Sequence, residues 1–125
     1  MDIYTSSLSN WRRIKAFGID IVDITAKSGF HWFAPEYEYV MQYKNGLMTQ
    51  EQYTELYIAK MRQSFRQYHA NWVLLKHKKD VAFVCYCRYE ENGHRVFCHR
   101  HIFVDLLSKY LTKEGVPHVL KGELL

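Results

Sequence analysis

Three cysteines and a histidine–arginine pair carry the most reactive side chains of this sequence. Cys85 and Cys87 alternate within an apolar segment, and Cys98, His99 and Arg100 stand together where the next amphipathic segment begins. A helix that starts near Cys98 would direct free backbone N–H groups at this position. Arg100 would add a guanidinium fork that suits a phosphate or carboxylate. This pattern predicts an anion site, and a surface arginine beside a capping histidine is the equally weighted alternative.

The cysteines allow three further interpretations. Cys98 at a helix start could be a thiol of lowered pKa, although a buried and inert cysteine is the commoner case. Cys85, Cys87, Cys98 and His99 could together ligate zinc, but the usual C-x₂-C spacing is missing, so we predict no metal and assign no cofactor. The C-x-C spacing on a strand places Cys85 and Cys87 on one face and also allows a regulatory thiol pair.

Polar side chains follow the first two predicted strands as well as the third. Ligands of open parallel α/β sheets bind outside the carboxyl ends of the strands, so we expect the site there. The candidate ligand-binding residues are Thr5, Ser6, Ser7, Thr25, Lys27, Cys85, His99 and Arg100, with Asp23 and Cys98 as candidate catalytic groups.

A specific geometry follows from this assignment. The Arg100 guanidinium should turn toward the loop after the first strand, where the hydroxyls of Ser6 and Ser7 converge with helix N–H groups. A buried salt bridge at Arg100 would instead make that residue structural, and would favour a protein-interaction function over a ligand site.

Alternation of strands and helices must position these residues. The pattern predicts one α/β domain over residues 1–125, with a mainly parallel sheet of about four to five strands and helices on both faces, a Rossmann-like three-layer sandwich. The apolar segment 81–87 should be an interior strand. The other expected strands are 2–5, 19–25 and 116–120, and residues 26–48 should form an irregular connection. The expected helices are 11–17, 49–72, either continuous or interrupted near Tyr68 with a restart at Asn71, and one after residue 98 with a stripe of Ile102, Leu106, Tyr110 and Leu111.

Composition excludes several classes of protein. The chain has 125 residues, 48% hydrophobic, with a net charge of +4 and three cysteines, which is ordinary for a globular protein. It shows neither an apolar segment long enough to span a membrane nor a secretion signal, so we expect a cytoplasmic protein. Residues 60–79 hold six basic side chains and no acid, which permits a nucleic-acid partner, although a solvated helix face is the commoner explanation.

The chain resembles the uncharacterised family called domain of unknown function four-eight-eight, especially its small phage-type members. The resemblance rests on the opening IYTSS, on IDIVDIT, on Ala34–Pro35, on the segment 84–101 with its FCHRH, and on a closing KGEL. It implies an α/β sandwich with shared polar residues near the strand ends. Relatives often have an acid two residues after the first cysteine, where this chain has Cys87. If that acid is catalytic in relatives, this chain either lacks the step or uses Glu90 or Glu91 instead.

Three functions remain open on this basis. The first is binding of a phosphorylated small molecule or nucleotide at the strand ends, with or without catalysis. The second is a non-catalytic phage or host regulator that uses the aromatic loop 30–43 on a protein partner. The third is a small Cys/His zinc protein. A deep pocket at the strand ends would favour the first, and a flat aromatic surface with a closed pocket would favour the second.

Overall fold

A four-stranded parallel sheet forms the centre of the structure, a computed structural model that describes residues 1–124. Its order is β2-β3-β1-β6, and each neighbouring pair is parallel. The four carboxyl ends therefore lie at one edge. The strand that contains most of residues 81–87 is interior, which confirms that prediction. The strands are β1 (Asp2–Ser7), β2 (Asp20–Asp23), β3 (Asp80–Cys85) and β6 (Val119–Glu123).

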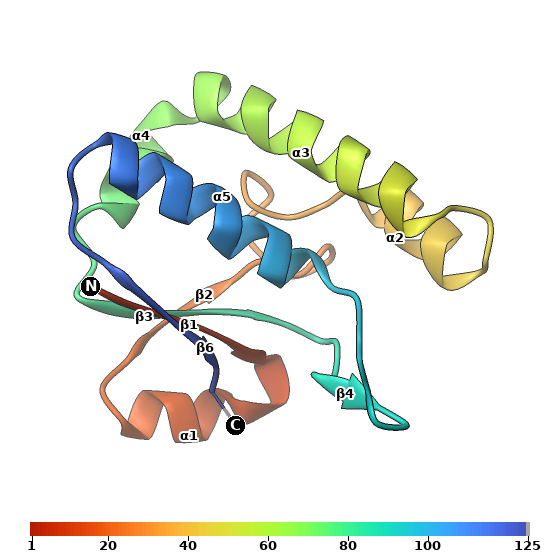
Figure 1. Ribbon diagram of the computed structural model, residues 1–125, viewed down its shortest axis with the longest axis horizontal. Helices are drawn as coiled ribbons and strands as arrows, with labels where there is room; N and C mark the ends of the chain where they lie inside the picture. Colours follow the sequence, from red (N-terminus) through yellow and green to blue (C-terminus); the bar gives the residue numbers. More distant parts are fainter. Residues whose placement is uncertain (125) are drawn as a thin grey trace.

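Helices cover both faces of the sheet (Figure 1). Along β3, Val81 and Phe83 join the large hydrophobic cluster of one face, while Ala82 and Val84 pack with Ile14 on the other. The predicted three-layer α/β fold is confirmed. One layer holds the short turn η1 (Leu8–Asn10) and α1 (Trp11–Ala16); the opposite layer holds α2 (Tyr37–Lys44), α3 (Gln50–Gln67), α4 (His69–Leu75) and α5 (His99–Lys113).

The longest helix begins at the capping box that the sequence indicates. The Thr49 hydroxyl accepts the Gln52 backbone N–H at 3.1 Å, and the Gln52 side chain accepts the Thr49 N–H at 2.9 Å. Of the two alternatives for residues 49–72, the structure has the interrupted one: the chain turns at Tyr68, and α4 follows as a separate helix from His69.

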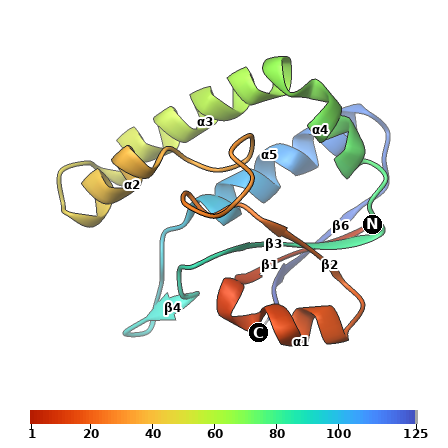
Figure 2. The same ribbon diagram turned by 180° about the vertical axis from the view of Figure 1, so that it is seen from behind.

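Two segments differ from their predicted structures. The connection 26–48 is irregular only in part, since α2 occupies its second half. The predicted loop after β3 contains a short hairpin of β4 (Glu90–Glu91) and β5 (His94–Arg95), which Figure 2 shows projecting beyond the sheet. Asn92 and Gly93 turn the hairpin with φ of 52° and 79°, the positive values that a type I′ turn requires.

The buried stripe of α5 starts at Arg100. It continues through Phe103, Val104, Leu107 and Leu111 at helical spacing, and all are buried. The predicted stripe of Ile102, Leu106, Tyr110 and Leu111 was therefore displaced around the helix, and its first three members are only half-buried. No helix among the described residues is both long and apolar enough to cross a membrane.

Candidate functional site

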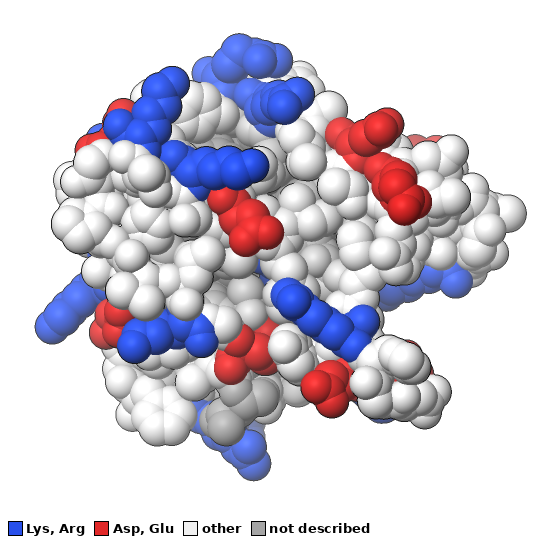
Figure 3. Space-filling model, in the orientation of Figure 1, with Lys and Arg blue, Asp and Glu red and all other residues white. Residues whose placement is uncertain are grey.

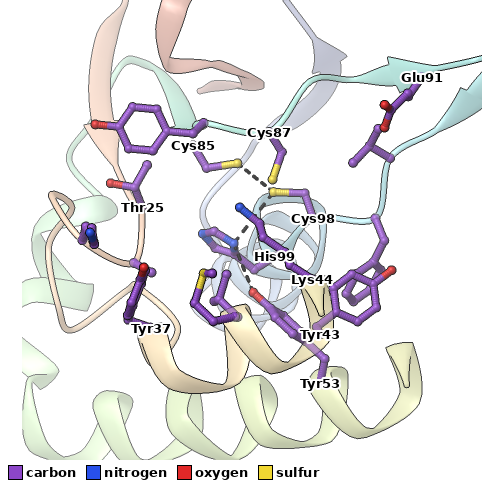
Figure 4. A pocket seen from close by; sticks show the side chains of 17 residues that line it. Thr25, Tyr37, Tyr43, Lys44, Tyr53, Cys85, Cys87, Glu91, Cys98 and His99 are labelled. Carbon is purple, nitrogen blue, oxygen red and sulfur yellow. Dashed lines mark hydrogen bonds between the residues drawn. The ribbon is translucent and has the colours of Figure 1, made fainter. Parts of the chain in front are cut away.

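A cavity of about 450 Å³ opens at the carboxyl edge of the sheet, beside the ends of β2 and β3 (Figure 4). The loop after β2, helix α2, the segment after β3 and the start of α5 form its walls. This volume lies in the range of small-molecule sites. Its polar, thiol and aromatic lining includes Thr25, Lys27, Tyr37, Tyr43, Lys44, Tyr53, Cys85, Cys87, Glu91, Phe97, Cys98 and His99.

Three cysteine sulfurs meet at one side of this cavity. The Sγ atoms of Cys85, Cys87 and Cys98 lie within 4.8 Å of one another, and those of Cys85 and Cys98 are 2.7 Å apart. Cys85 is the last residue of β3, and Cys87 lies in the bend that follows, so the strand predicted over 81–87 ends two residues earlier than expected. Cys98 precedes the first helical turn and completes the cluster. All three cysteines are free thiols.

The three thiols differ in pKa. Hydrogen bonds from Cys85 and then Cys98 lower the pKa of the Cys87 thiol. Hydrogen bonding to Cys87 raises the pKa of Cys85 to about 11, and burial raises that of Cys98 well above its usual value. Of the three thiols, the half-buried Cys87 is therefore the one that loses its proton most readily.

His99 is a buried neutral imidazole. Its Nε2 lies 2.6 Å from the Ile24 carbonyl oxygen, which can only accept, so Nε2 carries the proton. Nδ1 then faces the Tyr53 hydroxyl at 3.4 Å and Cys98 Sγ at 3.8 Å as an acceptor. Burial lowers the pKa of His99 to about 4, so the ring is uncharged near neutral pH. An imidazole with a free lone pair beside a thiol can act as a base.

Arg100 lies behind the thiols and is fully buried. Its guanidinium donates to Cys85 Sγ at 2.9 Å, to the Cys87 carbonyl oxygen at 2.9 Å and to both carboxylate oxygens of Glu123, at 2.9 and 3.4 Å. Thr5 donates to the same carboxylate at 2.6 Å. Burial opposes the charge of Arg100, but Cys85, Cys98 and Glu123 raise its pKa, so it stays a cation.

This geometry differs from the expected one at Arg100. The residue does lie in the first turn of α5, but its guanidinium faces Glu123 and the sulfurs instead of Ser6 and Ser7. Ser6 Oγ donates to the Leu124 carbonyl oxygen at 2.7 Å, and Ser7 Oγ lies 3.1 Å from Ser9 Oγ. The predicted convergence of serine hydroxyls with the guanidinium is therefore wrong.

The loop after β2 brings two of its three predicted residues to the cavity. Thr25 and Lys27 line it, whereas Asp23 does not. The Asp23 carboxylate accepts the Thr25 N–H at 2.9 Å and the Ser28 hydroxyl at 3.0 Å, and so holds the turn that presents Thr25. Asp23 therefore holds the cavity wall in shape through this turn and does not itself line the cavity.

Besides Lys27, the cavity is lined by residues that the sequence did not single out for binding, among them Lys44. Lys44 at the end of α2 and Lys27 are exposed, and the Lys27 ammonium lies 4.8 Å from the centre of the Tyr37 ring. Tyr43 and Phe97 form an aromatic wall with ring centres 5.1 Å apart. The aromatic character of residues 30–43 was visible in the sequence, but no periodicity there indicated a helix with Lys44 at its end.

The comparisons with known proteins can now be set beside this geometry. The family model described as the active DUF488-N3 subclade matches residues 23–111, more than two thirds of the chain. The chain belongs to this subclade of DUF488. The resemblance stated from the sequence is thereby confirmed. No curated protein and no solved structure matches the chain significantly.

The DUF488 match includes the thiols, His99 and Arg100, but not the residues that bury Arg100. Thr5 and Glu123 lie on β1 and β6, outside the matched range. Cys87, at the position where the resemblance implied an acid, joins the thiol cluster. Of the two acids considered as replacements, Glu91 lines the cavity at its outer side, and Glu90 is not among the lining residues.

Proposed function

We propose that this DUF488 protein binds a phosphorylated nucleotide in the cavity at the carboxyl ends of β2 and β3. The observation that carries the proposal is a cavity lined both by several aromatic side chains and by two exposed lysines, Lys27 and Lys44. The base would pack in the cavity, and the phosphate would lie at its mouth.

The aromatic wall supports a planar ligand. Tyr43, Tyr53 and Phe97 contact one another with ring centres 5.1–5.6 Å apart. Tyr37 lies across the mouth. Base–aromatic stacking is favourable for any nucleobase because each has a π-face. The wall thus supports nucleotides as a class over aliphatic phosphates.

The charges at the mouth support the phosphate. Lys27 and Lys44 line the cavity, and Glu91 is the one acidic side chain among the described residues that line it. Donors therefore outnumber carboxylates, as an anion requires. Because the Arg100 guanidinium already donates to Glu123, Cys85 and Cys87, we assign the phosphate to the two lysines.

Cys98 remains a candidate catalytic group within this proposal. It lines the cavity, and His99 Nδ1 lies 3.8 Å from its sulfur, the arrangement of a thiol beside its base. Asp23 is retained only as a positioning residue, because both of its carboxylate oxygens already accept hydrogen bonds in the turn after β2.

The basic stretch 60–79 supports a nucleic-acid partner less well. Lys60, Lys76 and Lys78 each pair with a carboxylate, at 3.0, 3.0 and 3.4 Å. Basic and acidic side chains are interspersed on the face shown in Figure 3, without one continuous basic surface. A free nucleotide therefore has better support than a nucleic-acid strand.

The buried salt bridge at Arg100 was expected to favour an interaction protein, and the cavity was expected to favour a ligand. We give the cavity more weight, because Phe33 and Tyr39 of the aromatic loop are buried in the core. They are not available to a partner.

Calorimetric titration with AMP, adenosine and inorganic phosphate tests the proposal. AMP should bind, and adenosine should bind more weakly. The Lys27→Ala/Lys44→Ala double variant should weaken AMP binding about ten- to a hundred-fold, the loss of a charge-assisted contact. Lys78→Ala, which removes a distant exposed lysine, is the matched control and should leave the affinity unchanged. Equal affinity for AMP in the double variant and the wild type would overturn the proposal.

A further inference from the structure

The three thiols at the cavity have a second use that does not depend on any nucleotide. We propose that Cys85, Cys87 and Cys98 form a redox site, in which a hydroperoxide oxidises Cys87 and the Cys85–Cys98 pair then closes as a disulfide. A dithiol reductant returns the site to three thiols. The spacing of the sulfurs, their unequal solvent exposure and the cation beside them support this site.

The spacing of Cys85 and Cys98 suits a disulfide better than a metal site. Two thiolates on one tetrahedral zinc ion, with Zn–S near 2.3 Å, lie about 3.8 Å apart. The observed separation is 2.7 Å. A disulfide bond of about 2.05 Å requires the sulfurs to approach by about 0.7 Å, whereas zinc requires them to separate by about 1 Å. The shorter movement leads to the disulfide.

Arg100 also disfavours a metal ion at this position. Its guanidinium donates to Cys85 Sγ at 2.9 Å and lies 3.6 Å from Cys98 Sγ. A buried cation there repels a metal ion and stabilises negative charge on sulfur. Arg100 therefore favours negative charge on Cys85 and Cys98 at the moment when these sulfurs exchange.

Solvent exposure distinguishes Cys87 from the other two cysteines. All three line the cavity, but Cys85 and Cys98 are buried at 1% and 4% exposure, whereas Cys87 is half-buried. The lowered pKa of Cys87 agrees with its place as the first thiol to react. A small peroxide can reach this sulfur through a cavity of about 450 Å³.

The chemistry balances in three steps. The Cys87 thiolate attacks the peroxide, so an S–O bond forms, the O–O bond breaks and the departing alkoxide takes a proton to become an alcohol. Cys98 then attacks the Cys87 sulfenic acid; an S–S bond forms and the hydroxyl leaves with the Cys98 proton as water. Cys85 displaces Cys87 from Cys98, and its proton passes to the Cys87 sulfur. Two thiols have lost two electrons and two protons, and the peroxide has become alcohol and water.

His99 is placed to assist the second step. Its neutral Nδ1 lies 3.8 Å from Cys98 Sγ and can receive the thiol proton as Cys98 attacks. The same proton then protonates the leaving hydroxyl.

Intact-mass spectrometry of the reduced protein with one equivalent of hydrogen peroxide tests the proposal. The folded wild type should lose about 2 Da, and peptide mapping should place the new bond between Cys85 and Cys98. Dithiothreitol should restore the mass. In Cys87→Ser the same bond should form at least about ten-fold more slowly, because the accessible thiolate is missing. Cys98→Ser should lack that bond and leave a sulfenic acid on Cys87 that dimedone captures.

The matched control is the wild type in urea, which has the same thiols without their arrangement. Oxidation in urea should be slower and should give mixed pairings. Circular dichroism shows whether each variant folds. If Cys98→Ser does not fold, the oxidation rate of Cys87→Ser tests the proposal alone. The proposal is overturned if folded and unfolded protein oxidise at equal rates, if Cys87 gains two oxygens with no disulfide, or if the purified protein holds one equivalent of zinc that shields the thiols.

Discussion

Arg100 shows that a residue type typical of anion sites can serve the fold. Its charge is fully buried, and the cost of that burial is offset by Glu123 and by the sulfur and carbonyl acceptors around it. The same network fixes the start of α5 against β6 and the end of β3. Arg100 therefore positions the thiols.

We predict that Arg100→Ala destabilises the protein strongly. The substitution leaves Glu123 buried at 9% side-chain exposure without its cation, and breaking such a pair costs about 3–5 kcal/mol. Urea unfolding should show this loss in the free energy of unfolding. Lys78→Ala breaks an exposed pair with Asp20 and should cost less than about 1 kcal/mol. An unchanged unfolding midpoint for Arg100→Ala would contradict the structural assignment.

His99 gives the stability a pH dependence. Its pKa falls from 6.5 to about 4 on folding, because burial disfavours the imidazolium. Between these values the unfolded chain binds more protons, so the free energy of unfolding rises with pH. The contribution of His99 is complete above pH 6.5 and is lost as the pH falls toward 4.

We therefore expect wild-type stability to fall between pH 6.5 and pH 4, by at most about 3 kcal/mol from His99. Burial also lowers the pKa of His101 to about 4, so that residue adds to the same window. His99→Gln should flatten the profile measured by urea unfolding at several pH values. His77→Gln, at an exposed position, should leave the profile as it is. A profile as steep in His99→Gln as in the wild type would assign the effect elsewhere.

At the scale of elements, periodicity identified the sheet and most helices but misassigned one face of α5. Two stripes of α5 have hydrophobic residues at helical spacing, so hydrophobicity alone does not choose between them. The predicted stripe contains Ile102, Leu106 and Tyr110, and the buried one contains Phe103 and Leu107. The observed stripe passes through Arg100. Its burial depends on Glu123, which lies on a strand about twenty residues later, and local sequence does not reveal such a pairing.

Helix α2 was missed for a related reason. Tyr39 is its one fully buried residue, while Tyr37 and Lys44 are exposed, so the segment has little amphipathic pattern. Contacts with other elements hold it, such as the edge-to-face pair of Tyr39 with Tyr53 on α3. The part of the site contributed by β2, β3 and α5 followed from the sequence, and the part contributed by α2 did not.

The turn after β2 is the element most sensitive to a small change. A Cβ atom at Gly29 would come within 2.5–2.6 Å of backbone atoms of Thr25 and Asp23. Backbone cannot move aside as a flexible side chain can. Gly29→Ala should therefore open this turn, cost about 2 kcal/mol or more, and displace Thr25 and Lys27 from the cavity wall.

Thermal unfolding and AMP titration of Gly29→Ala measure both effects. Gly18→Ala is the control, because Gly18 has a φ of 74° with no neighbour within 4 Å. It should cost about 1 kcal/mol through backbone strain alone and should leave AMP binding unchanged. Wild-type stability in Gly29→Ala would show that the turn is looser than the structure indicates.

At the scale of the whole molecule, the two ends of the chain complete the support of the site. β6 pairs in parallel with β1, and these strands carry Glu123 and Thr5. The Glu123 carboxylate accepts hydrogen bonds from both Thr5 and Arg100. The thiols and His99 come from the middle of the chain. The site is therefore assembled only when the last strand has joined the sheet.

This arrangement predicts that a chain ending at His118 does not fold. Removing β6 leaves the β1 edge unpaired, removes the acceptor of the Ser6 hydroxyl at Leu124, and buries Arg100 without a carboxylate. Glu123→Gln is the companion variant, since it keeps the strand and removes only the charge; it should fold with a free energy of unfolding reduced by about 3 kcal/mol or more. Circular dichroism and urea unfolding compare the two. If the shortened chain unfolds cooperatively at the wild-type midpoint, β6 is dispensable, and the carboxylate of Glu123 cannot be what holds Arg100 beside the thiols.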